Sequence, residues 1–131
     1  MSSKTEILTR LLEDLSRASQ GNIQASLIIS RSQGLTICSH YPETTSPGAI
    51  PDEDVIAGRA TQIQMATAKV FRELRRGPLV RMLIEGDNGY VIIGGAGEDA
   101  ILAVLTSRRV NLGYLFFMLS KIARQIAQTL V

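Results

Sequence analysis

The sequence predicts an α+β fold in which three helices cover an antiparallel sheet. The predicted elements follow the order α-β-β-α-β-β-β-α, so helices and strands do not alternate as they do in a doubly wound parallel sheet. Short segments rich in glycine and polar residues join consecutive strands, which is typical of antiparallel hairpins. A chain of 131 residues is long enough to bury a hydrophobic core, and we expect one domain over residues 1–131.

The composition argues against several classes of protein. Hydrophobic residues make up 45% of the chain and charged residues 20%, as in a folded domain. A net charge of +2 and an aromatic content of 5% argue against nucleic-acid binding. The segment MSSKTEILTR lacks the apolar region of a signal peptide, and the apolar run at 110–120 is far shorter than the roughly 20 residues of a membrane span. We therefore expect a cytoplasmic protein with no membrane insertion.

Residues 4–19 are predicted to form the first helix. Ser3 and Glu6 have the spacing of a capping box, and Gly21 supplies a stop signal. Between these signals, apolar residues recur every three or four positions, so they share one helical face. These residues are Ile7, Leu8, Leu11, Leu12 and Leu15.

A β-hairpin is expected next. Residues 25–30 and 35–40 are β-branched and apolar, and the intervening RSQG offers the polar residues and the glycine of a tight turn. Residues 41–51 contain three prolines and a glycine, so they are predicted to form a loop.

The second helix is predicted over residues 52–76. Acidic residues begin it and arginines end it, which suits the helix dipole, and Gly77 and Pro78 stop it. One face is predicted to be apolar and to face the core. It comprises Ile56, Ala60, Ile63, Thr67, Val70, Phe71 and Leu74. The opposite face carries Met65, Lys69, Arg72 and Arg76, with Gln62 and Thr61 at its margins.

Three strands, at 79–85, 90–95 and 100–107, are predicted to form a meander. Asn88 and Gly89 are the dipeptide that type I′ hairpin turns favour. The first of these strands has one central charge and no proline, so an open edge there would invite pairing with another strand. We therefore predict a homodimer interface along it, formed by Leu79, Val80, Arg81, Met82, Leu83, Ile84 and Glu85.

The last helix is predicted over residues 112–131. Asn111 can cap its first turn, and the following residues form an apolar stripe. The stripe comprises Leu112, Leu115, Phe116, Leu119, Ile122, Ala123, Ile126 and Leu130.

No catalytic, cofactor or metal site is predicted. Residues 95–100 formally match G-x-G-x-x-G/A, but a dinucleotide site requires a following helix and a later acidic residue, and the chain has no Asp or Glu after Asp99. Cys38 and His40 are the only residues of their kinds, too few for a structural zinc site. The acidic residues lie at a helix start and in a turn, where capping and turn formation account for them. We therefore expect a turn at the glycines and a protein that is not an enzyme.

The exposed face of the second helix is the remaining candidate site. Methionine adapts to irregular partners, and neighbouring Lys and Arg select acidic ones. Ordinary solvation of this face is an equally simple interpretation.

With these elements in order, the chain resembles the Roadblock family, whose small domains are related to profilin-like and longin folds. The resemblance covers nearly the whole chain. It rests on SQGLTI in the first hairpin, on LIEGDNGYVIIGGAGEDAILAVLTS in the meander, and on NLGYLFFMLSKIA in the last helix.

The resemblance implies a five-stranded antiparallel sheet in the order 2-1-5-4-3, with the second helix on one face and the first and third on the other. Family members typically dimerise by pairing their third strands, with the second helices side by side. The proteins bind or regulate small Ras-like GTPases, or act as scaffolds. By position, the GTPase-binding surface would include Gln62, Met65, Lys69, Arg72 and Arg76.

The leading hypothesis is a non-catalytic homodimer, or a heterodimer with a related protein, that binds a small Ras-like GTPase and modulates its hydrolysis or localisation. An arginine inserted in trans can accelerate GTP hydrolysis about 10³–10⁵-fold. The candidates by location are Arg59, Arg72, Arg75 and Arg76. The alternative is a dimeric scaffold subunit of a motor or signalling complex, with no effect on hydrolysis. A third hypothesis is a small-molecule sensor or hydrolase that uses the glycine turn or Cys38.

Overall fold

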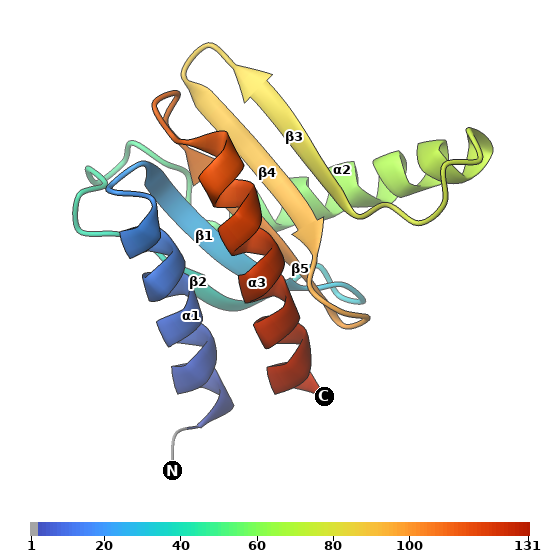
Figure 1. Cartoon of the computed structure of the whole chain (residues 1–131), viewed down its shortest axis with the longest axis horizontal. Coiled ribbons are helices and arrows are strands. Elements are labelled where there is room, and N and C mark those ends of the chain that lie inside the picture. The colour runs from blue at the N-terminus through green and yellow to red at the C-terminus, as the bar shows by residue number, and fades with distance from the viewer. Residues whose placement is uncertain (1–2) are drawn as a thin grey trace.

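A five-stranded antiparallel sheet lies between two helical layers in the computed structural model, which describes residues 3–131 (Figure 1). The helices are α1 (Lys4–Ala18), α2 (Glu53–Glu73) and α3 (Leu112–Leu130). The strands are β1 (Ile23–Ser30), β2 (Thr36–His40), β3 (Arg81–Gly86), β4 (Gly89–Gly95) and β5 (Ala100–Thr106). Their order in the sheet is β2-β1-β5-β4-β3, so the expected element order and sheet order are confirmed.

Two separate hydrophobic clusters fill the spaces between the layers. On one face, α1 and α3 cover side chains that include Ile28 and Val104. On the other face, α2 covers Leu27, Ile29 and Ala103. Side chains alternate between the faces along each strand, so β1 and β5 contribute to both clusters and are buried almost throughout. Figure 1 shows α1 and α3 side by side on the near face and α2 behind the sheet.

The helix starts follow the predicted capping chemistry. The Ser3 side-chain oxygen accepts a hydrogen bond from the Glu6 backbone N–H (3.1 Å), and the Asn111 side-chain oxygen accepts one from the Tyr114 N–H (3.0 Å). Each bond satisfies a backbone donor that has no partner within the helix. At the end of α1, the chain reverses through Gln20 and Gly21, both with positive φ.

Several predicted boundaries shift. β1 begins at Ile23, two residues before the predicted start, and α2 ends at Glu73 rather than at residue 76. Arg75 has a φ of 56°, so the chain leaves the helical conformation before the arginine run is complete. β3 covers residues 81–86 instead of 79–85, although the Val80 carbonyl still accepts a hydrogen bond from the Gly95 N–H (3.1 Å).

The turn between β3 and β4 also differs from the prediction. Gly86 and Gly89 pair across the strands, so the two turn residues are Asp87 and Asn88 rather than Asn88 and Gly89. Neither has a positive φ, which excludes a type I′ turn. The conformation instead depends on Gly89, which has a φ of 151°. A Cβ atom at Gly89 would lie 2.0 Å from the Thr106 carbonyl oxygen, so only glycine fits there.

We predict that Gly89→Ala lowers the free energy of unfolding by about 2–3 kcal/mol, because backbone must move to relieve the clash. Denaturant unfolding monitored by circular dichroism measures the change. Gly58→Ala is the matched control: it lies on an exposed face of α2, where a Cβ meets nothing within 4 Å, and it should raise stability by about 0.5–1 kcal/mol. Equal midpoints for the two variants would contradict the close packing at Gly89.

Candidate partner-binding surfaces

The second half of α2 extends beyond the sheet. Its buried residues are Ile56, Ala57, Ala60 and Gln64, and none lies beyond Gln64. Figure 1 shows the remaining turns projecting past the edge at β3. The predicted apolar face is therefore only partly correct: Val70 is 46% exposed and Leu74 59% exposed, because no part of the same subunit lies beneath them. An overhanging apolar helix of this kind lacks a packing partner.

The five predicted partner-binding residues are all exposed, four on this helix and one just beyond its end. They are Gln62, Met65, Lys69, Arg72 and Arg76. Their spacing of three and four residues places the first four along one ridge of α2, and Arg76 follows the end of the helix. The structure brings Met65 and Arg72 beside Arg31, which projects from the end of β1. Gln62 instead accepts a hydrogen bond from Arg59 (2.9 Å), so Arg59 is held against the helix.

An open groove of about 750 Å³ runs along this flank of α2. Its walls are the helix, the loop from α2 to β3, and the turn from β4 to β5; the lining side chains include Arg31, Gln64, Ala68, Arg72, Leu79 and Glu98. Within the described residues, the buried Gln64 Oε1 and Arg31 Nε atoms have no hydrogen-bond partner. The charged side chains in the lining of the groove are those of Arg31, Arg72 and Glu98.

Sequence reasoning missed the role of Arg31. Its Nη2 donates hydrogen bonds to the carbonyls of Gly97 (3.1 Å) and Ala100 (3.2 Å), which fixes the β4–β5 turn to the end of β1. A Cβ at Gly95 would lie 2.9 Å from the same nitrogen. Gly97 has a φ of 88° and lies against Ala127 of α3. These glycines thus serve the turn and its packing, and strand β5 follows them, so the structure contains no dinucleotide fingerprint here.

Strand β3 is an edge strand, as predicted. Most of its residues are exposed, because only β4 pairs with it. Pairing with β4 places Arg81, Leu83 and Glu85 on the α3 side of the sheet, and Met82 and Ile84 on the α2 side. Leu79 and Val80, the other two predicted interface residues, precede the strand. The free backbone groups and apolar side chains of this edge are available for pairing.

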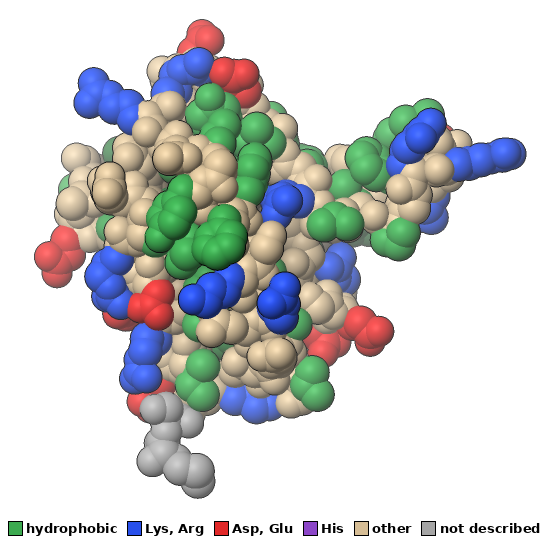
Figure 2. All heavy atoms as spheres, in the orientation of Figure 1, with side chains coloured by type: hydrophobic (Ala, Val, Ile, Leu, Met, Phe, Trp, Pro, Cys, Tyr) green, Lys and Arg blue, Asp and Glu red, His purple; other side chains and the backbone are tan. Residues whose placement is uncertain are grey.

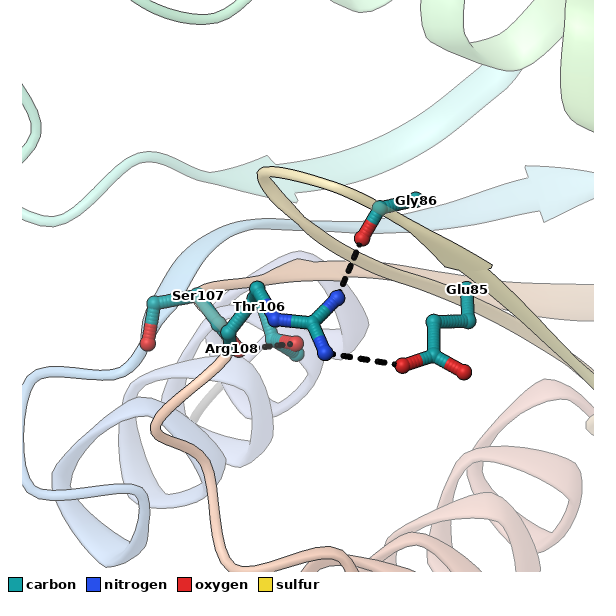
Figure 3. Close-up of polar contacts among 5 residues, drawn as sticks. All are labelled: Glu85, Gly86, Thr106, Ser107 and Arg108. Atoms are coloured by element: carbon teal, nitrogen blue, oxygen red, sulfur yellow. Dashed lines mark hydrogen bonds and ion pairs between the residues drawn. The ribbon is translucent and has the colours of Figure 1, made fainter.

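Two arginines fix the edge strand to the rest of the domain. Arg108, which follows β5, donates to the Gly86 carbonyl (2.7 Å) and pairs with the Glu85 carboxylate (2.9 Å), as Figure 3 shows. Arg81 lies over the Phe116 ring of α3, 4.8 Å from its centroid, and donates to Ser120 (3.1 Å). Arg81, the one central charge predicted for this edge strand, is therefore held against α3. No sequence periodicity signals either contact, since both join residues distant in the chain.

The loop before α2 is held at both ends. The Tyr41 hydroxyl donates to the Pro51 carbonyl (2.7 Å), and Thr45 donates to the Gln24 carbonyl (2.8 Å). Partial burial, together with the nearby Glu53 and Asp52 carboxylates, raises the pKa of Tyr41. A tyrosine hydroxyl is already protonated at neutral pH, and the raised pKa extends the pH range in which it donates this hydrogen bond.

The catalytic and metal hypotheses gain no geometric support. Cys38 is buried beneath α1, where its sulfur lies 3.2 Å from the Thr9 hydroxyl. Across residues 3–131, no group of three or more His, Cys, Asp or Glu side chains is placed to hold a metal ion. No helix in this described range is long and apolar enough to cross a membrane.

Comparisons with known proteins agree with this fold. Residues 10–106 match the sequence profile of the Roadblock/LC7 domain. The chain is 29% identical over 120 residues to uncharacterized protein MJ1340 of Methanocaldococcus jannaschii, an alignment that covers 92% of this chain and 96% of the relative.

Solved structures with low sequence identity share the architecture. The gliding protein MglB from Thermus thermophilus superposes with a TM-score of 0.87 at 19% identity, covering 98% of this chain and 92% of that one. An MglB structure described as having a tetrameric arrangement gives a TM-score of 0.88 at 19% identity, with 98% and 91% coverage. At these identities the likeness establishes the fold alone.

We predict that Arg31→Ala lowers the free energy of unfolding by about 2 kcal/mol, because two charge-assisted hydrogen bonds to turn carbonyls are lost. Thermal or denaturant unfolding measures the loss. The control Arg10→Ala removes an exposed arginine from α1 and should change stability by less than about 0.5 kcal/mol. If the two variants were equally stable, Arg31 would not hold the turn.

Proposed function

The chain belongs to the Roadblock/LC7 domain family, and on this premise we propose that it is a cytoplasmic, non-catalytic dimer that binds a small Ras-like GTPase. The observation that carries the proposal is the unpacked half of α2. This segment presents apolar and cationic side chains beyond the edge of the sheet, where only another molecule can cover them. A buried catalytic centre within one subunit would not account for such a surface.

Dimerisation through β3 would account for the exposed edge. Antiparallel pairing of two β3 strands would satisfy their free backbone groups and continue the sheet. The overhanging half of α2 would then lie over the sheet or the helix of the partner subunit, which would cover Val70 and Leu74. Both unpacked features are therefore explained by one symmetric interface.

The sequence of β3 favours one register for this pairing. Directly opposed residues of an antiparallel pair point to the same face of the sheet. A two-fold axis at Leu83 would place Arg81 opposite Glu85 of the partner subunit, and Met82 opposite Ile84 of the partner subunit. An axis at Met82 would oppose Arg81 to Leu83, and an axis at Ile84 would oppose Leu83 to Glu85. Of these three axes, only the one at Leu83 places a basic side chain opposite an acidic one and an apolar side chain opposite an apolar one.

The GTPase would bind along the exposed ridge of α2. Arg72 and Met65 line the flank that also contains Arg31, so a partner there would meet cations and an adaptable apolar side chain. Such a surface suits an acidic partner. The protein would act by holding the catalytic groups of the GTPase, or by supplying an arginine in trans. Of the candidate arginines, Arg59 is the one held by a side-chain hydrogen bond, whereas Arg72, Arg75 and Arg76 lie exposed near the free end of the helix.

We predict that Arg72→Glu weakens binding to the cognate Ras-like GTPase at least tenfold, because it reverses a charge on the proposed contact ridge. Candidate GTPases are those encoded in the same genome neighbourhood. Calorimetry measures affinity, and GTP turnover with and without this protein measures the effect on hydrolysis. Arg10→Glu makes the same charge change on α1, across the sheet, and should leave binding unchanged.

The two functional hypotheses give different results in this experiment. Binding with altered GTP turnover supports a regulator, whereas tight binding with unchanged turnover supports the scaffold. An affinity insensitive to Arg72→Glu would remove α2 from the interface, and the absence of binding to every candidate GTPase would refute the proposal.

For the dimer, we predict that Arg81→Glu and Glu85→Arg each weaken self-association, and that mixing the two variants restores it. With the axis at Leu83, each variant alone opposes like charges twice, whereas the mixed dimer opposes unlike charges twice. Each of the two exposed pairs contributes up to about 1 kcal/mol, so their combined effect on the dimer dissociation constant is up to about thirtyfold. Native mass spectrometry and sedimentation measure the species present.

Met82→Lys tests the interface in any register, because it places a charge on the paired strand. It should shift the protein toward monomer or make it insoluble. A soluble dimer that Met82→Lys does not perturb would exclude pairing through β3, and random mixing of the two charge variants would exclude the proposed register.

A further inference from the structure

A ridge of aromatic and basic side chains lies on the outer face of α3, across the sheet from α2. The ridge comprises Tyr114, Phe117, Lys121 and Arg124, all exposed and spaced three or four residues apart. Tyr114 is 47% exposed and Phe117 66% exposed, and their rings stack with centroids 6.5 Å apart. Figure 2 shows apolar side chains gathered in the middle of this face, with basic side chains next to them.

These aromatic rings are not required by the core of the subunit. The side chains of α3 that fill the space against the sheet are Leu115, Leu119, Ile122 and Ile126. Tyr114 and Phe117 point away from that core, so their exposure leaves a large apolar area in water. Exposed aromatic pairs bordered by polar groups are typical of protein interaction sites.

A small apolar hollow lies between α3 and the start of β3, and Ser120 in its lining is one helical turn from Phe117 and from Arg124 of the ridge. Its volume is about 220 Å³. Gly94, Ile92 and Leu102 form the floor, and Leu119, Ala123 and Val80 form the walls. Pockets for drug-sized molecules are larger, about 300–1,000 Å³, so the hollow suits a single apolar side chain.

Gly94 keeps the hollow open, although the backbone does not require glycine there. Its φ is not positive, and an added Cβ would have its nearest neighbour, the Val80 carbonyl oxygen, at 3.5 Å, which is an ordinary contact. Gly94 pairs with Arg81 and Leu102, which places an added Cβ on the α3 side of the sheet, inside the hollow. In the GG pair of β4, Gly95 therefore makes room for Arg31, and Gly94 leaves the hollow open.

The charged side chains on the ridge and at the rim of the hollow are basic. Lys121 and Arg124 continue the ridge, and Arg81 lies at the rim, held over Phe116. The chain contains no Asp or Glu after Asp99, so α3 itself has no acidic residue. The nearest acid along β3, Glu85, is already paired with Arg108. A partner with acidic groups would therefore meet complementary charge and no competing carboxylate on α3.

We propose that this face of α3 is a second docking site, which binds an acidic amphipathic segment of a partner protein. One apolar side chain of the segment fills the hollow over Gly94, its apolar face covers Tyr114 and Phe117, and its carboxylates pair with Lys121 and Arg124. The site is distinct from the α2 ridge, because the sheet separates them, so both can be occupied at once. A lipid headgroup has no apolar group to enter this hollow, which favours a protein segment.

The experiment selects ligands for the full-length protein from a phage-displayed library of random peptides. Selected peptides are then labelled, and their affinities are measured by fluorescence anisotropy. We expect enriched peptides to combine acidic residues with apolar residues at helical spacing. Phe117→Ser and Lys121→Glu should each weaken their binding at least tenfold, with circular dichroism showing an unchanged fold because both residues are exposed.

Two further variants separate a docking role from a structural one. Gly94→Ala fits the backbone and should preserve or raise the melting temperature, yet weaken peptide binding several-fold by narrowing the hollow. Arg72→Glu, on the α2 ridge, should leave peptide binding unchanged. Loss of GTPase binding in Arg72→Glu with retained peptide binding would show that the two sites are independent.

Three outcomes would overturn the inference. They are a selection without enrichment, enriched peptides that lack acidic residues, and peptides whose binding is insensitive to Phe117→Ser and Gly94→Ala. Vesicles of phosphatidylserine and phosphatidylcholine test the lipid alternative in parallel. Vesicle binding that depends on Phe117, without any selected peptide, would assign the ridge to a membrane and would also refute the proposed docking site.

Discussion

The burial of β1 and β5 on both faces is the constraint on which the rest of the structure depends. Their side chains alternate between two hydrophobic clusters, so each face of the sheet needs a helical cover. α1 and α3 pack side by side and cover one face broadly. A single helix, α2, covers the other face where it crosses β1 and β5, and there its small residues Ala57 and Ala60 allow close approach. β3, farthest from this centre, receives the least cover.

The unpacked surfaces follow from this arrangement. α2 has 21 residues, and at about 1.5 Å per residue it is longer than the part of the sheet that it buries. Its second half therefore leaves the subunit near the start of β3, so the exposed helix and the exposed strand edge lie close together. Arg108 and Arg81 hold β3 in place on the α3 side, and its other edge remains exposed. The same edge strand also forms one wall of the hollow beneath α3, so both proposed docking sites border it.

The glycines of GGAG illustrate how one motif can serve several physical purposes. Gly97 permits the positive φ of the turn and the close approach of α3, Gly95 makes room for the Arg31 guanidinium, and Gly94 leaves a hollow. None of these roles involves a phosphate. The match to a dinucleotide fingerprint arises because tight turns and phosphate cradles both need backbone without side chains.

The sequence by itself determined the elements, their order and the caps at Ser3 and Asn111, because periodicity and capping depend on residues close together in the chain. It also identified the edge strand and the exposed residues of α2. Only the tertiary structure decided that the apolar face of α2 loses its cover after Gln64, that Arg31 and Arg108 bind turns distant in sequence, and that Gly94 floors a hollow. These features depend on distances between separate elements. Local patterns of hydrophobicity do not show how far a helix extends across the sheet that it covers.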